Sequence, residues 1–529
     1  MKSPLSYFLI FGIIILSIFT GIFTIWRNQH LKEIPNFNEK TFNVPISAKY
    51  VPKNADLIFN WKINPSILPN YIENYQAKVN KNIINKKIKL IIDSSFKLIG
   101  LDYTEDISKF AGGHGSFAIF DTNSQLLNDW LIILEKNKDI DIEEGLESIS
   151  EITVSGKDVN QKNKFNTKDS NLISKKINSS QSIYFSNEKE HILISSNPKI
   201  IKSSIGNFKN DKLNTKETYH NIQLKNKISD GILLLEMSPK KIFNLIGQEK
   251  DLLEINQTEK LISSINIDNE KLILEGILTY DSKNKREIDD PSYDLINMEK
   301  EFNLFDNFIL IDNPKKYFGK NASDPYKKLI ASVITESTEE DHSNLFKIIL
   351  ENTQGNLVWL KDKDWLALTR KTYTDKKKIN DVLRKERFSS SNIDFTNKNL
   401  EVWSKITTNN NDKYEIKENI EAIIEENDGA YLWSQNLSSI SDFYNKKYLP
   451  NNTKSEYKEN EVNDFDDILR IHLGKKQTKV ILNNFYPYVL LRSMLGNKLN
   501  YPQDINISIA IPTVNYPDFI KFKINLKTI

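Results

Sequence analysis

An uncharged run of twenty residues near the N-terminus, residues 7–26 (YFLIFGIIILSIFTGIFTIW), most constrains what this chain can fold into. As an α-helix rising about 1.5 Å per residue it would be about 30 Å long, which is the thickness of a bilayer's hydrocarbon core. Cleavable signal peptides have shorter apolar regions, of about 7 to 15 residues. Tyr7 and Trp26 stand at its two ends, where amphipathic rings favour the headgroup zone. We therefore expect a single-pass transmembrane anchor at 7–26 after a short tail at 1–6, and favour it over a cleaved signal.

The charges beside this segment bear on which side of the membrane holds the rest of the chain. Lys2 and the α-amino group precede it, while Arg27, His30 and Lys32 follow it, so the positive-inside comparison is nearly balanced. A short tail ahead of an uncleaved segment favours a cytoplasmic N-terminus. We expect an extracytoplasmic soluble part, in a periplasm or thylakoid lumen, with the N-terminal helix in contact with membrane lipid.

Composition excludes several classes of function. The 72 basic and 70 acidic residues are interspersed and give a net charge of +2, so no nucleic-acid partner is expected. The chain contains no cysteine, which rules out disulfides, thiolate metal sites and cysteine nucleophiles. Its length of 529 residues exceeds what one hydrophobic core supports, so we expect at least two domains.

The first expected domain spans 48–285 and follows a stalk at 27–47 that lacks a sustained apolar period. It opens with a strand at 56–61 and a helix from 64, on which apolar residues recur every three or four positions up to Ile83. Strand pairs follow at 115–120 with 130–136 and at 182–186 with 191–195. Asn197 and Pro198 then suit the start of a helix, 231–246 reads as strand then helix, and 265–280 closes the domain with two strands.

The second expected domain spans 286–529 and shows a similar order of elements. It has an opening strand at 307–311 and a strand pair at 356–369. The Asn-Pro pair at 313–314, AYLWS at 430–434 and KVILNNFYPYVLL at 479–491 lie about 245 to 250 residues beyond the Asn-Pro pair at 64–65, SIYFS at 182–186 and the strand-to-helix segment at 231–246. A constant offset suggests a tandem duplication. The sequence therefore predicts an α+β fold: two similar tandem modules of mainly antiparallel sheet with packed helices, preceded by one transmembrane helix.

Three stretches, at 48–72, 98–120 and 356–368, resemble a family of uncharacterised cyanobacterial proteins classed as a domain of unknown function. That family has an N-terminal transmembrane segment, a proline-bearing strand-to-helix opening, and a Gly-Leu-Asp segment that ends in a glycine-rich turn. Lys109 and Phe110 stand where the family often has Pro-Trp. The resemblance implies the anchor and a photosynthetic bacterial source, and it implies no activity.

AGGHGS at 111–116 is the most functional-looking segment, because clustered glycines free backbone amides and His114 can titrate near neutrality. It matches neither phosphate-binding glycine pattern, and a strand follows it rather than a helix. We interpret it as a tight turn with positive φ ahead of the strand at 117–120.

Other candidate clusters predict no chemistry either. No two of the six histidines, at 30, 114, 191, 220, 342 and 472, lie at helical or hairpin spacing. Asp464, Asp466 and Asp467 read as an exposed acidic helix start rather than a calcium loop. Asp102, Glu105 and Asp106 could be paired carboxylates, but helix capping is the simpler reading. We therefore assign no catalytic, cofactor-binding or metal residue, and no cofactor.

Two classes of function stay open at this point. The favoured one is a non-catalytic binding or scaffolding protein at a bacterial membrane, with another envelope or thylakoid protein as its partner. The alternatives are an enzyme with its site between the modules and a lipid or pigment carrier. Convergence of Asp102, Asp106 and His114 in one cavity would favour the enzyme.

Overall fold

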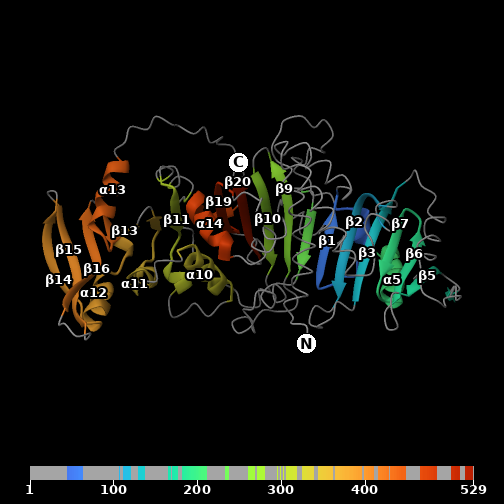
Figure 1. The fold of residues 1–529 in the computed structure, drawn as a ribbon, viewed down its shortest axis with the longest axis horizontal. Coiled ribbons are helices and arrows are strands. Elements are labelled where there is room, and N and C mark those ends of the chain that lie inside the picture. Colours follow the sequence, from blue (N-terminus) through green and yellow to red (C-terminus); the bar gives the residue numbers. More distant parts are fainter. Residues whose placement is uncertain are drawn as a thin grey trace. The chain divides into compact units, whose positions relative to one another are not determined.

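The computed structural model (Figure 1) describes these residues: 44–62, 107, 111–120, 129–137, 165–167, 170–176, 182–210, 231, 233–237, 260–268, 271–279, 295, 298, 302, 305–318, 325–338, 344–361, 364–395, 398–409, 415–427, 429–447, 465–484, 502–512 and 519–527. The expected anchor at 7–26 and the helix expected after residue 64 lie outside them. Within those ranges, no helix has the length and apolar character needed to cross a membrane.

The chain divides into two units. The first contains Met1–Tyr280, Leu482–Pro502 and Asn525–Ile529, and the second contains Asp281–Ile481 and Gln503–Ile524. The domain boundaries expected from the sequence, 48–285 and 286–529, stay a prediction. Ser47, the last residue of the expected stalk, is buried in the first unit.

The first unit is an antiparallel sheet in which each described strand bonds to the next in space. In spatial order the strands are β4 (Phe165–Thr167), β5 (Ser170–Lys176), β6 (Ser182–Glu188), β7 (His191–Ser195), β3 (Asp129–Lys136), β2 (Ala111–Phe120), β1 (Leu57–Trp61), β8 (Leu233–Met237), β9 (Leu261–Asp268) and β10 (Lys271–Thr279). The 3-10 helix η1 (Ile46–Tyr50) and helix α5 (Pro198–Lys209) pack on β2, β3 and β7.

The second unit repeats that strand order. In space its described strands run β14 (Ser389–Phe395), β15 (Lys398–Asn409), β16 (Glu415–Asn427), β17 (Ala430–Ser434), β13 (Trp365–Arg370), β12 (Leu357–Lys361), β11 (Asn307–Ile311), β18 (Phe465–Leu473), β19 (Asp504–Pro512) and β20 (Phe519–Lys527). Its described helices are α9 (Lys315–Phe318), α10 (Pro325–Ser337), α11 (Asn344–Asn352), η5 (Lys371–Tyr373), α12 (Lys376–Lys385), α13 (Leu437–Lys447) and α14 (Lys475–Asn484).

A hydrogen-bonded clasp starts the helix that follows β7. Asn197 accepts a bond from the backbone N–H of Lys199, and its side-chain amide donates to Asp129 at 3.1 Å. The Ser195 hydroxyl donates to the carbonyl of Trp130 and accepts from the backbone N–H of Asn197. The clasp therefore joins the end of β7 to the start of β3 and caps α5.

The second unit contains the same clasp after β17. Asn436 accepts from the backbone N–H of Ser438, and its side-chain amide donates to Asp364 at 2.7 Å. The Ser434 hydroxyl donates to the carbonyl of Trp365 and accepts from the backbone N–H of Asn436. An Asp-Trp pair and a Ser-X-Asn triplet thus have the same roles in each unit.

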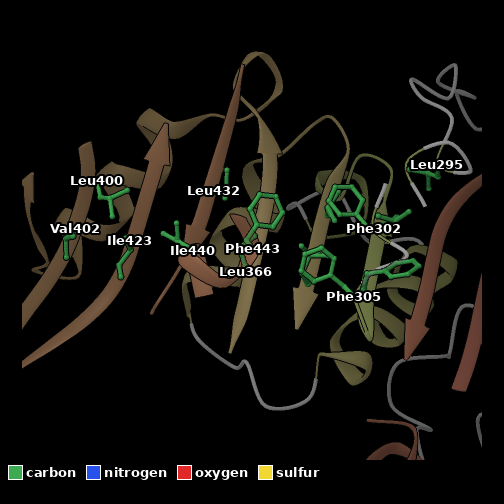
Figure 2. Close-up of a cluster of buried hydrophobic side chains, with 14 residues drawn as sticks. Leu295, Phe302, Phe305, Leu366, Leu400, Val402, Ile423, Leu432, Ile440 and Phe443 are labelled. Atoms are coloured by element: carbon green, nitrogen blue, oxygen red, sulfur yellow. The ribbon is translucent and has the colours of Figure 1, made fainter. Parts of the chain in front are cut away.

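The main core of the second unit lies on one face of this sheet, beneath α13. Figure 2 shows aromatic side chains of this cluster, including Phe305 and Phe443, with aliphatic ones from several strands, including Leu366, Leu400 and Leu432. The rings of Phe305 and Phe443 stack with centroids 6.0 Å apart. Burial of this apolar surface is the main favourable term for such a sheet.

The α+β class expected from the sequence is wrong. In the described residues antiparallel sheet dominates both units, helices are few, and the expected transmembrane helix is not found. Sequence periodicity underestimates the strands because several are polar. Residues 415–427 (EIKENIEAIIEEN) are rich in Glu, which strands generally disfavour, yet they form β16 because β15 and β17 supply its hydrogen bonds.

Most of the predicted strand pairs are confirmed, but two of the landmarks used to infer the duplication are wrong. The pairs expected at 115–120 with 130–136, at 182–186 with 191–195, and at 356–369 are confirmed, and so is the helix after Asn197. Two second-domain landmarks are wrong. AYLWS is β17, whose place in the sheet matches HILIS in β7 rather than SIYFS, and residues 479–484 belong to helix α14 rather than to a strand.

Two glycines of the first unit provide a matched test of this packing. A Cβ atom on Gly115 in β2 would lie 2.2 Å from the Trp61 ring and 2.9 Å from the carbonyl oxygen of Ile133, whereas one on Gly206 in α5 would meet nothing within 4 Å. We expect Gly115→Ala to lower the free energy of unfolding by about 1 to 3 kcal/mol through overpacking. Gly206→Ala should raise it by roughly 0.5 to 1 kcal/mol. Urea unfolding of both variants checks this, and equal effects would contradict the packing.

Candidate functional site

The segment at 111–116 is a strand in the structure, which corrects the expected turn. β2 begins at Ala111, and its pairing with β3 shifts register between Ala111 and Gly115. Among the described glycines only Gly429 has a positive φ, so the glycines of this segment do not serve left-handed turns. They serve close approach instead, because a Cβ on Gly112 would lie 3.2 Å from the Glu135 carboxylate.

This bulge brings His114 onto a carboxylate of the neighbouring strand. The Nδ1 atom of His114 lies 2.9 Å from Oε2 of Glu135, and the backbone N–H of His114 donates to the same oxygen at 3.2 Å. Both side chains are partly exposed. The pair has the arrangement of a base and its orienting carboxylate. Within the described residues, His114 makes no hydrogen bond to a hydroxyl that could act as a nucleophile.

A second histidine lies in the same row of the sheet. His191 is directly opposite Glu135 in the β3–β7 ladder and opposite Glu188 in the β6–β7 ladder, so the three side chains share one face. Unlike His114, His191 is buried, and the Tyr50 ring packs on it with centroids 5.2 Å apart. Tyr50 in turn stacks on Phe208 of α5. The row therefore runs from an exposed histidine to a buried one.

Burial favours the neutral forms of His191 and Tyr50, at the buried end of this row. Burial lowers the pKa of His191 below its ordinary value of 6.5, and the nearby carboxylates of Glu135 and Glu190 oppose that shift. Burial, with the charges of Glu188 and Glu190, raises the pKa of Tyr50 to about 12. Tyr50 is thus a neutral phenol at physiological pH, packed on a neutral imidazole.

Sequence reasoning missed His191 as a neighbour of His114. The two are far apart along the chain, and only the strand order β2–β3–β7 brings them to one end of the sheet. Within the residues that the structure covers, no group of three His, Asp or Glu side chains is placed to hold a metal ion. Asp102, Glu105 and Asp106 lie outside the described residues, as do His30, His220 and His342.

The acidic segment near 464–467 is also corrected. Phe465–Leu473 is strand β18 rather than a helix start, and Asp464 lies outside the described residues. Asp467 accepts a hydrogen bond from Nε of Arg470 at 2.6 Å, next to a register shift in the β18–β19 ladder. The carboxylate thus has an arginine partner within its own strand.

A second candidate surface is the end of the β15–β16 hairpin. The β14 ladder stops at Ser404 of β15, and the β17 ladder starts at Ile423 of β16. Among the described strands, residues 405–409 therefore pair only with β16, and residues 415–422 pair only with β15. We call residues 404–409 and 415–422 the hairpin arm. The β15–β16 pairing shifts register between Trp403 and Ser404, at its base. Such a bulge bends and twists a hairpin.

The hairpin arm exposes two isoleucines on one face. Ile406 pairs with Glu418 and Ser404 pairs with Ile420, so Ile406 and Ile420 are diagonal neighbours. Ile406 is 69% exposed and Ile420 is 43% exposed. Val402, two residues before Ser404 on the same strand, is buried in the core shown in Figure 2. The apolar face of the core thus continues onto the arm, where no described residue covers Ile406 and Ile420 fully.

The His191 environment predicts a pH dependence of stability. Because the folded-state pKa is below that of the unfolded chain, the unfolded chain takes up the proton first as the pH falls through about 6.5, and stability is lost in that window. We expect His191→Phe, which retains a ring against Tyr50, to flatten the loss of melting temperature between about pH 7.5 and 5.5.

Phe208→Leu is the matched control, because it loosens the same stack without removing a titratable group. It should lower the melting temperature at both pH values alike. An unchanged pH profile in His191→Phe would contradict the assignment.

No curated protein matches the sequence. A solved structure titled "Structure of crystal form III of TP0453" aligns with 49% of this chain and 87% of its own, at 9% sequence identity and a TM-score of 0.24. A family model described as "Protein of unknown function (DUF3352)" matches residues 9–528. The resemblance to a domain of unknown function is confirmed at that level, while a cyanobacterial source stays a prediction. The chain belongs to the DUF3352 family.

Proposed function

We propose that this protein is a membrane-anchored, non-catalytic binding protein whose hairpin arm docks a partner protein of the bacterial envelope or thylakoid. The observation that carries the binding role is the exposed Ile406 and Ile420 pair on one face of the arm. Single exposed apolar side chains are common on protein surfaces. Neighbouring β-branched ones that continue a core face are a feature of interaction sites.

The anchor supports the same proposal. The apolar segment at 7–26 has the length and end residues of a membrane span, and it would hold the two sheet units at a bilayer surface. With the N-terminus inside, the units would lie in the periplasm or thylakoid lumen of a cyanobacterium. A tether raises the local concentration of a binding surface near membrane partners, which makes modest affinity sufficient.

The His114–Glu135 pair favours a second candidate, an enzyme that uses His114 as a general base. That role requires a substrate or nucleophile within hydrogen-bond reach of the free Nε2 atom of His114. His191, the buried histidine of the row, packs against Tyr50 and is not accessible to a substrate. Binding by the arm therefore remains the preferred function.

The membrane anchor has a direct test. In membranes of expressing cells, the full chain should stay in the pellet after alkaline carbonate extraction, because an uncharged span of this length partitions into hydrocarbon. Ile15→Arg should shift it toward the supernatant, and Ile15→Leu should not. Protease added to intact spheroplasts should digest the large units. Release of the parent chain by carbonate would contradict the anchor, and protection of the units would contradict the exported orientation.

The docking role of the arm has a separate test. A photo-crosslinking residue at position 406 of the membrane-expressed chain should form a discrete adduct of higher mass. The same probe at position 438, an exposed site on α13, should form none. Ile420→Asp should remove the adduct at 406, because a charge beside Ile406 raises the cost of covering this face. Equal adducts from 406 and 438, or persistence in Ile420→Asp, would contradict the proposal.

A further inference from the structure

Positive charge is concentrated on helix α12, although basic and acidic residues are interspersed along the chain as a whole. Five cationic side chains of the helix and its end are exposed: Lys377, Lys378, Arg384, Lys385 and Arg387. Three of the chain's seven arginines lie between residues 370 and 387. We call these five residues the basic face.

The two carboxylates beside the basic face neutralise only part of it. Asp375 lies 3.7 Å from Lys378, and Asp381 lies 3.5 Å from Arg384. Among the described residues, Lys377, Lys385 and Arg387 form no ion pair. The net positive charge is therefore free to attract an anionic partner.

The opposite side of α12 is already occupied. Ile379 and Leu383 are fully buried. Lys376, on the inner side, pairs with Glu401 at 2.9 Å. The apolar side of α12 is therefore covered within its own unit, and its outer side would contact a membrane mainly through charge.

Arg387, the last residue of the basic face, lies at the end of α12 in an unusual backbone conformation. Arg387 has φ +67°, and the backbone N–H of Phe388 bonds to the carbonyl of Leu383 at 3.0 Å, which is the bonding pattern of a helix that ends on a left-handed residue. Glycine is the usual residue at such a position, because a Cβ strains it. Here Arg387 occupies this position, and it adds a cation to the basic face.

We propose that the basic face binds the surface of a bilayer that carries anionic phospholipid headgroups. The inference rests on the proposed membrane anchor, which would hold α12 within reach of such a surface. Flexible lysines and arginines on one side of a helix suit a plane of negative charge without fixed geometry. Tyr373, 39% exposed just before α12, adds a ring suited to the headgroup zone.

A nucleic acid fits this surface less well. It needs a positive track that follows a backbone over several phosphates. Glu426 is half-exposed beside Lys371 and Lys376 and interrupts the positive charge at one end of the helix. The basic face is therefore short and bordered by negative charge, which a lipid plane tolerates because its headgroups rearrange.

The absence of cysteine makes a clean test possible. The full chain carrying Asp381→Cys is labelled with an environment-sensitive fluorophore and reconstituted into nanodiscs of phosphatidylcholine, with or without phosphatidylglycerol. We expect a blue shift only in the discs that contain phosphatidylglycerol, and its loss in high salt, because salt screens exposed charges. The same label at Ser438→Cys, exposed on α13, should not respond.

Further substitutions separate charge from folding. Lys377→Glu with Lys385→Glu should abolish the shift, while Lys377→Arg with Lys385→Arg should preserve it. Arg387→Gly should reduce the shift and yet raise the melting temperature, because it relaxes the left-handed position. A merely structural role for Arg387 would leave the shift unchanged.

Three results would overturn the inference: no blue shift in anionic discs, an equal shift in neutral discs, or a response in neutral discs to duplex DNA as large as that to phosphatidylglycerol. Failure of the labelled chain to co-elute with discs would contradict the anchor rather than the basic face. The labelled chain is then mixed with phosphatidylglycerol vesicles. A blue shift there supports the inference, and its absence overturns it.

Discussion

Each unit is organised around a buried inner strand, β1 in the first unit and β11 in the second. β1 pairs with β2 on one side and β8 on the other, and β11 pairs with β12 and β18 in the same way. Every residue of β11 is buried, so its backbone groups have no access to water and need both neighbours. Along the chain, β2 and β3 are added outward from β1, and β4 to β7 then return from the outer part of the sheet to pair with β3. β8, β9 and β10 extend the other side, and the second unit follows the same path. The polar and exposed elements, such as β14 and the hairpin arm, are therefore at the periphery of that sheet.

Much of this central part could be predicted from the sequence. Continuous apolar runs such as NFILI, WLIILEK and HILIS are strands buried on both faces, and they were found where they were expected. The helix start at Asn197 and Pro198 was also predictable, because a capping side chain followed by proline favours a helix start through local interactions. These predictions succeeded because the interactions that decide them lie within a few residues.

The periphery and the candidate site could not be predicted in the same way. β16 is rich in Glu and is a strand because β15 and β17 pair with it. β14 is almost entirely exposed. Neither segment therefore has an apolar pattern that identifies a strand. The pairing of His114 with Glu135 depends on a bulge, and the nearness of His191 depends on strand order. The clasp pairs, Asp-Trp with Ser-X-Asn, did occur twice in the sequence, but their shared role needs the fold to be recognised.

The candidate functional features lie at the margins of the two sheets: the hairpin arm, the basic face of α12 and the exposed His114. Amide hydrogen exchange of the full chain, followed by mass spectrometry, tests that division most directly, because protection reports local stability. Peptides that cover β1 and β11 should exchange slowest within their units, and those that cover β14 and the hairpin arm should exchange fastest among the strands. Equal protection of the arm and β11 would contradict the account.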